Sequence, residues 1–169
     1  TKRGRFPIRL EDWEHVQGAD GGYAQVDPTD NRWLYVSSQR GSLSRNDQRT
    51  GVRRDIRYRK EGIRFNFIAP FRLSPHDPNV LYHGANVLLR SSWRGEGWEE
   101  ISPDLTADGA TSDPYGRDAN GTISTLAESP LVQGRLWVGT DNGSVWTSPD
   151  GGENWERVDG NIAGWRSYK

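Results

Sequence analysis

Residues 104–120 hold a cluster of groups suited to acid–base chemistry, namely Asp104, Asp108, Asp113, Tyr115, Arg117 and Asp118. Glycoside hydrolysis needs two carboxylates about 5–10 Å apart, one of which works as the acid. Asp113 and Asp118 are therefore the candidate catalytic residues, and Tyr115 and Arg117 are candidate ligand contacts. Two alternatives stay open: a solvated loop whose aspartates form turns, or a Ca²⁺ site built from loop oxygens, although the spacing matches no EF-hand loop.

A second pattern lies near the C-terminal end. Ser148, Asp150, Gly152 and Trp155 match Ser-x-Asp-x-Gly-x-x-Trp at every defined position. Asp150 is either a catalytic or metal-binding carboxylate or a turn residue. We favour the turn, because aspartate readily accepts hydrogen bonds from nearby backbone N–H groups and glycine permits a positive φ.

Residues 91–98 repeat this pattern with one change. Ser91, Gly95 and Trp98 keep their places, but Trp93 stands where aspartate belongs. This turn is expected to be held differently. Trp93 is expected to be exposed, and so able to stack on a sugar ring or contact a partner.

Both patterns belong to a longer repeat, which supplies the elements that position them. Tyr35, Tyr82 and Trp137 each follow a turn, and the intervals between them are 47 and 55 residues. A four-stranded propeller blade takes roughly 40–50 residues. Each interval fits one blade if residues 104–119 are an insertion.

The sequence thus predicts an all-β fold, a β-propeller fragment of about three four-stranded antiparallel blades plus an orphan strand. The blades are expected at 21–60, 63–103 and 120–160. Residues 1–20 should end a preceding blade, with the orphan strand near 13–18, and 161–169 should lead to a next blade. Strands of the third blade are expected at 122–128, 135–140, 144–148 and 155–158.

Turn and core residues follow from the same assignment. Asn142-Gly143 predicts a tight primed turn with positive φ angles. Little or no helix is expected, since no stretch shows 3.6-residue periodicity. Five large aromatic residues of the predicted strands are expected to pack between blades: Trp33, Tyr35, Tyr82, Trp137 and Trp146.

With these residues in view, the chain resembles the Asp-box (BNR-repeat) propellers, which include sialidases, xyloglucan-active glycoside hydrolases and the VPS10 domains of sortilin-like receptors. It is most similar to secreted bacterial BNR-repeat proteins, through residues 73–79, 82–86 and 137–143. The resemblance covers about 12–160 and implies a few blades of a larger propeller. An Asp-box shapes a blade turn and marks no active site, so it implies fold more than function.

Composition narrows the function classes. The net charge is −1, from 22 basic and 23 acidic residues, and favours neither nucleic acid nor a membrane surface. The absence of cysteine excludes disulfides and thiolate metal sites. No apolar run approaches the length of a membrane span. His15, His76 and His83 show no metal-ligand spacing.

The resulting expectation is a secreted, periplasmic or cell-surface scaffold that binds a protein, peptide or carbohydrate, without nucleic acid or membrane insertion. The alternative is part of a glycoside hydrolase that uses the acidic loop. No cofactor is expected, with Ca²⁺ as the open alternative. Three blades do not close a ring. The remaining blades of the same or a larger polypeptide, or a second copy, are expected as partners.

Overall fold

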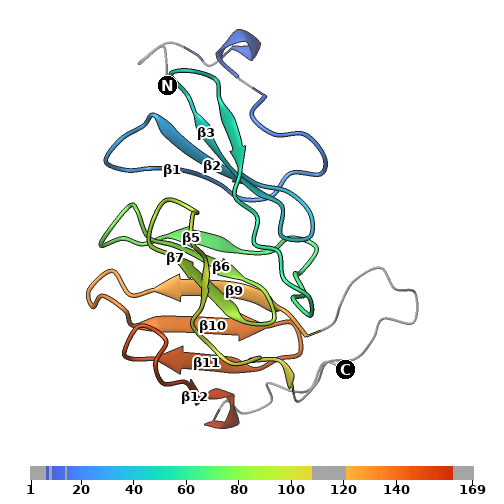
Figure 1. Cartoon of the computed structure of the whole chain (residues 1–169), viewed down its shortest axis with the longest axis vertical. Helices are drawn as coiled ribbons and strands as arrows, with labels where there is room; N and C mark the ends of the chain where they lie inside the picture. The colour runs from blue at the N-terminus through green and yellow to red at the C-terminus, as the bar shows by residue number, and fades with distance from the viewer. Residues whose placement is uncertain (1–6, 8, 14, 108–120, 162–169) are drawn as a thin grey trace.

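A computed structural model describes residues 7, 9–13, 15–107 and 121–161, and these form three four-stranded antiparallel sheets. The sheets follow one another along the chain and are stacked face to face (Figure 1). Each is a meander in which strands pair in chain order. This confirms the predicted all-β blade arrangement, and we call the sheets blades 1, 2 and 3.

The strand bounds are as follows. Blade 1 contains β1 (Ala24–Val26), β2 (Trp33–Ser37), β3 (Leu43–Asp47) and β4 (Arg53–Asp55). Blade 2 contains β5 (Phe71–Leu73), β6 (Leu81–Gly84), β7 (Leu88–Ser91) and β8 (Glu99–Glu100). Blade 3 contains β9 (Ile123–Glu128), β10 (Leu136–Thr140), β11 (Val145–Ser148) and β12 (Glu156–Arg157).

The outermost strand of each blade is short and charged. β8 and β12 have two residues each, and all three residues of β4 are charged and exposed. Such strands resist pairing with a foreign edge. The inner strands instead carry the apolar and aromatic side chains that suit a buried, pleated surface.

Blades 1 and 2 meet through a core of buried apolar residues, namely Tyr35, Leu43, Ile56, Phe71 and Leu81. Blades 2 and 3 meet through a second core, made of Tyr82, Leu88, Leu105, Ile123, Leu126, Leu136 and Val138. In each case the tyrosine on the second strand of one blade packs against the next blade. Burial of this apolar surface is the main force that holds neighbouring blades together.

Trp137 occupies the position of these tyrosines but is not packed. Tyr35 is 0% exposed and Tyr82 is 4% exposed, whereas Trp137 is 46% exposed. Leu136 and Val138, on either side of it, face blade 2, so Trp137 points to the opposite face of blade 3. No described residue covers that face, so the packing of Trp137 between blades stays a prediction.

The segment before blade 1 also differs from expectation. The described residues near 13–18 belong to no strand, and Leu10–Asp12 form a 3-10 turn (η1). Trp13 closes this turn by donating its backbone N–H to the carbonyl of Leu10 at 3.1 Å, and it is 73% exposed. The orphan strand lacks a paired neighbour, and an unpaired strand leaves its backbone groups unsatisfied.

The turn between β10 and β11 is not the primed turn expected from Asn142-Gly143. Only Gly143 has a positive φ, of 86°, and its N–H bonds to the carbonyl of Thr140 at 3.1 Å. The N–H of Thr140 bonds to the carbonyl of Ser144 at 3.0 Å. This is the longer hairpin loop in which an ordinary turn is followed by a left-handed glycine.

We expect Leu136→Ala to lower the free energy of unfolding by about 2–5 kcal/mol, because it opens a cavity between blades 2 and 3. Leu136 is 1% exposed, whereas Leu131, in the turn before it, is 89% exposed and provides the matched control. Leu131→Ala should change the free energy of unfolding by less than about 0.5 kcal/mol. Urea denaturation of the two variants measures both values, and equal losses would contradict the assigned interface.

Candidate functional site

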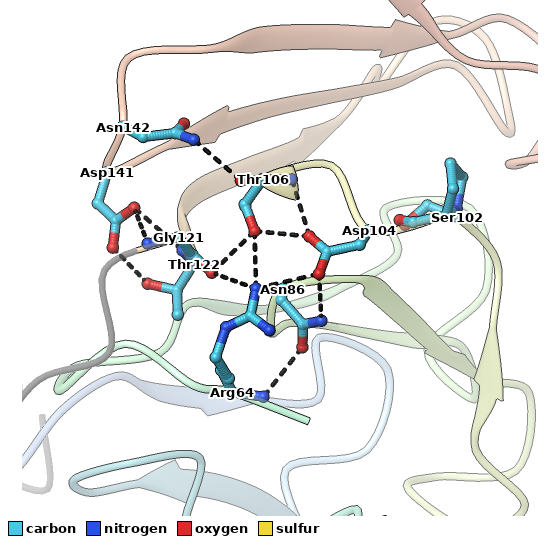
Figure 2. A network of polar contacts seen from close by, with 10 residues as sticks. Arg64, Asn86, Ser102, Asp104, Thr106, Gly121, Thr122, Asp141 and Asn142 are labelled. Atoms are coloured by element: carbon cyan, nitrogen blue, oxygen red, sulfur yellow. Dashed lines mark hydrogen bonds and ion pairs between the residues drawn. The ribbon is translucent and has the colours of Figure 1, made fainter. Parts of the chain in front are cut away.

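The links that follow the second and fourth strands emerge at the same edge of the stacked blades. They include the β8–β9 link, whose described parts are 101–107 and 121–122, and the short loops 85–87 and 141–144. Figure 2 shows the polar network that joins them. We call this edge the loop edge. Loops held on a rigid scaffold are where proteins most often place binding or catalytic groups.

Asp104 is the acceptor at the centre of one half of this network. Its Oδ1 accepts the backbone N–H of Thr106 at 2.9 Å and the Thr106 hydroxyl at 2.6 Å. Its Oδ2 accepts the Asn86 amide at 2.8 Å and the Arg64 guanidinium at 3.0 Å. Burial pushes the pKa of Asp104 upward, but the hydrogen bonds from Thr106, Asn86 and Arg64 outweigh it and lower the pKa.

Asp141 holds the other half. Its Oδ1 accepts the backbone N–H groups of Gly121 and Thr122 at 2.9 and 3.0 Å, and its Oδ2 accepts the Thr122 hydroxyl at 2.7 Å. The Thr106 hydroxyl joins the halves, because its one hydrogen is shared between Asp104 Oδ1 at 2.6 Å and the carbonyl of Gly121 at 2.9 Å. The two described ends of the β8–β9 link are therefore fastened to each other and to blade 3 (Figure 2).

This arrangement is a clamp, not an acid–base pair. Both carboxylates accept several strong donors, and the pKa of Asp104 is lowered, whereas a general acid needs a raised pKa. Asp113 and Asp118, with Tyr115 and Arg117, lie outside the described residues, as does Asp108. Their expected catalytic and ligand-contacting roles stay predictions.

Sequence reasoning missed most of the clamp. Arg64, Asn86 and Asp141 lie in three separate segments of the chain, and none belongs to the Ser-x-Asp-x-Gly-x-x-Trp pattern. One signal was available: Asn86 and Asp141 each lie four residues after the aromatic residue of their repeat, Tyr82 and Trp137. An amide or carboxylate that recurs at the end of the second strand can form hydrogen bonds with the neighbouring β8–β9 link.

The Ser148–Trp155 turn lies at the opposite edge, between β11 and β12, because β11 separates it from the Asp141 loop. The Ser148 hydroxyl donates to Asp150 at 2.9 Å and accepts the N–H of Gly152 at 2.9 Å. Asp150 accepts the side-chain amide of Asn154 at 2.6 Å and its backbone N–H at 2.9 Å, and these hydrogen bonds lower the pKa of Asp150. The Trp155 indole donates to the carbonyl of Ile101 at 2.9 Å, so this turn also grips blade 2.

The Ser91–Trp98 turn has the same frame without the aspartate. Ser91 accepts the N–H of Gly95 at 3.0 Å, and the Trp98 indole donates to the carbonyl of Ile56 at 2.7 Å. The backbone N–H of Glu96 bonds to the carbonyl of Trp93 at 3.0 Å, which supplies the closure that aspartate provides in the other turn. Trp93 itself is 76% exposed.

Gly95 and Gly152 are required in these turns for two reasons. Their φ angles are 91° and 101°, in the region that favours glycine. A Cβ at Gly152 would lie 2.5 Å from the carbonyl oxygen of Ile101, and one at Gly95 would collide with the side chain of Ile56. Both turns therefore pack their backbone directly against the preceding blade.

His83 is buried between the rings of Phe65 and Trp98, with ring centroids 4.9 and 6.0 Å away. Neither ring nitrogen has a hydrogen-bond partner. Burial lowers the pKa of His83 to about 3, and the positive charge of Arg57 adds to this effect. His83 is thus neutral at ordinary pH and fills space inside the protein.

Among the residues that the structure describes, no group of three or more histidine, cysteine, aspartate or glutamate side chains is placed to hold a metal ion. That part of the chain also contains no helix long and apolar enough to cross a membrane.

No family model and no curated protein matches the chain. Solved structures share its fold, among them a xyloglucanase and YCF48. A GH74 xyloglucanase from Xanthomonas campestris matches with a TM-score of 0.57 and 26% identity, over 80% of this chain and 23% of the xyloglucanase chain. A structure of YCF48 bound to D1 peptide matches with a TM-score of 0.53 and 13% identity, over 82% of this chain and 39% of that chain.

The chain therefore spans less than half of either matched protein. Its three meander sheets, stacked as in these structures, make it a fragment of a β-propeller. Further blades complete such a ring, since propellers typically have 4–8.

The clamp predicts a specific pH dependence. Asp104 has a pKa of about 4 in the unfolded chain and a lower one in the folded protein, so its charge stabilises the fold fully above about pH 5. This contribution is lost as the pH falls through the folded pKa. We expect Asp104→Asn to cost about 1–2 kcal/mol in the free energy of unfolding near neutral pH.

The deficit should shrink as the pH falls through the folded pKa of Asp104, below which both proteins carry an uncharged side chain. Urea denaturation of wild type and variant across this range measures it. Asp20→Asn, at an exposed carboxylate, serves as the control. A deficit of the same size at every pH would mean that the charge of Asp104 is not what stabilises the clamp.

Proposed function

We propose that this chain is part of a secreted or cell-surface Asp-box β-propeller that acts as a binding scaffold for a protein, peptide or glycan. The observation that carries the proposal is the clamp at the loop edge. Its two carboxylates, Asp104 and Asp141, hold neighbouring loops together through hydrogen bonds. A surface made of loops with fixed positions is suited to binding.

Rigid loops favour binding because little conformational entropy is lost when the ligand arrives. Thr106 and Thr122 are 1% and 0% exposed, whereas the side chains of Arg64 and Asp104 are 32% and 31% exposed and Asp141 is exposed, so the clamp has a buried centre and a solvent-accessible rim. The same fold carries a bound peptide in YCF48, which makes peptide binding compatible with this architecture without establishing it here.

A glycoside hydrolase is the second candidate, and one observation favours it: the 26% identity with the GH74 xyloglucanase. Under this hypothesis Asp113 and Asp118 would act as the two carboxylates, with further groups on other blades. Arg64 would then have an indirect role, since it fixes Asp104 next to the acidic segment.

The two candidates predict opposite results in one assay. As a scaffold, the protein should bind members of a peptide or glycan array but release no reducing sugar from xyloglucan. Removal of a working acid or base typically lowers the rate of hydrolysis by about 10²–10⁴-fold. Asp113→Asn and Asp118→Asn should therefore change nothing in the assay, because there is no turnover to lose.

Asp20→Asn is the matched control, at a carboxylate outside the acidic segment. Xyloglucan hydrolysis that falls by this factor in either variant, but not in the control, would overturn the scaffold and establish the hydrolase.

A further inference from the structure

The link between β4 and β5, residues 56–70, runs along the loop edge and lines an open pocket. The volume of the pocket, about 520 Å³, lies within the range typical of small-ligand sites. All its lining residues fall between 57 and 65, and they are basic or aromatic with two exceptions, Glu61 and Ile63. Arg64, between two of the lining residues, belongs to the clamp. The pocket is therefore part of the surface that we propose to bind.

The wall of this pocket is fastened to blade 2. Tyr58, Ile63 and Phe65 pack against a buried apolar cluster in the loop after β6 and in β7. The Tyr58 hydroxyl donates to Oε1 of Glu100 at 2.8 Å, and the ammonium group of Lys60 donates to the same carboxylate at 2.8 and 3.0 Å. A wall held in place in this way loses little conformational entropy when a ligand binds.

Of the basic residues that line the pocket, Arg57 alone has no carboxylate partner among the residues that the structure describes. Lys60 forms an ion pair with Glu100 at 2.8 Å, and Arg59 forms one with Asp55 at 2.5 Å. Asp55 accepts the backbone N–H of Arg57 at 2.9 Å, but its ion pair is with Arg59. The guanidinium of Arg57 forms neither an ion pair nor a hydrogen bond with any described residue.

The surroundings of Arg57 also lack a compensating negative charge on the interior side. The side chain is half-buried, and its Nε is buried without a hydrogen-bond partner. Burial and then the positive charge of Arg57 lower the pKa of His83, so this neighbour is neutral at ordinary pH. A half-buried guanidinium without a partner gains a charge-assisted hydrogen bond when an anion arrives, in a site partly shielded from water.

The aromatic ring of the pocket is already engaged, which favours a charged ligand over a stacked one. The ring centroid of Phe65 lies 4.9 Å from that of His83 and 5.9 Å from the guanidinium carbon of Arg57. Gly41 lies so close that a Cβ there would come within 2.4 Å of the Phe65 ring. Binding through the guanidinium of Arg57 needs no free face of this ring, whereas stacking of a sugar does.

We propose that this pocket binds an acidic side chain, aspartate or glutamate, of a partner peptide, whose carboxylate pairs with Arg57. The inference rests on the proposed binding function and names a ligand class for it. The planar guanidinium presents parallel N–H groups that match the two oxygens of a carboxylate. Ile63 and the ring of Tyr58 supply apolar surface for the residues next to the acidic one.

Glu61 opposes such a ligand and gives a test of sign. It is exposed, it has no ion pair with a described residue, and it lies in a turn closed by the N–H of Ile63 and the carbonyl of Lys60 at 3.3 Å. Its repulsion of an anion is weak because water screens exposed charges. Glu61→Gln should therefore strengthen the binding of an acidic peptide about twofold or more.

The test is an NMR titration of the full chain with acetyl-Leu-Glu-Leu-amide and with acetyl-Leu-Gln-Leu-amide, which has nearly the same shape without the charge. We expect the glutamate peptide to shift the amide signals of Tyr58, Ile63 and Phe65. The glutamine peptide should bind about tenfold more weakly, as loss of one charge-assisted hydrogen bond predicts. This comparison uses the wild-type protein and does not depend on the folding of a variant.

Arg57→Gln should lower the affinity for the glutamate peptide to that of the glutamine peptide. Arg53→Gln is the matched control, because Arg53 is an exposed arginine of the same basic stretch that lies outside the pocket and forms no ion pair with a described residue. It should change the affinity by less than about twofold, since water screens exposed charges. The amide signals of blade 3 show whether each variant remains folded.

Equal affinity for the two peptides, or an equal loss in Arg57→Gln and Arg53→Gln, would overturn the site, since binding would then reflect a general attraction to basic residues. Weaker binding in Glu61→Gln, or no shift with the glutamate peptide, would overturn it as well. Inorganic phosphate that shifts these signals where the glutamate peptide does not would replace the acidic side chain by a phosphate ligand. Array binding that survives Arg57→Gln would sink this site and leave the scaffold function standing.

Discussion

The structure depends on one repeated contact, in which the aromatic residue on the second strand of a blade packs against the next blade. Tyr35 packs against Phe71 and Leu81 of blade 2, and Tyr82 packs against Leu136 and Val138 of blade 3. A single four-stranded sheet would leave the apolar side chains of its inner strands in contact with water. The blades therefore stabilise one another, and the loops at both edges are positioned only as well as these interfaces are packed.

The blades meet face to face, so residues in the loops at their two edges can differ without changing the core between the faces. At the loop edge, Asp104 and Asp141 fasten the ends of the β8–β9 link. At the opposite edge, the corresponding turn positions hold Arg94, which forms an ion pair with Asp27 of blade 1, and Gly151.

Much of the fold could be predicted from the sequence, because local signals agree with the blade. The sequence predicts strands of blade 3 at 122–128, 135–140, 144–148 and 155–158, and they lie at 123–128, 136–140, 145–148 and 156–157. Contacts between repeats could not be predicted in this way. Arg64, Asn86 and Asp141 meet only after blades stack, and the exposure of Trp137 depends on a neighbour outside the described chain. The strand expected near 13–18 is absent from the described residues for the same reason, because a β-strand also needs a neighbouring strand to pair with.

The most direct test of this account is the reactivity of Trp137 toward hydroxyl radicals in the assembled protein, compared with Trp93 in the same sample. Trp93 lies in an edge turn and is 76% exposed, whereas Trp137 lies on the open face of blade 3. If a further blade completes the propeller, Trp137 should be as strongly protected as Tyr35 and Tyr82, while Trp93 reacts. A Trp137 that reacts as fast as Trp93 would contradict the claim that each blade is held by the aromatic contact to its neighbour.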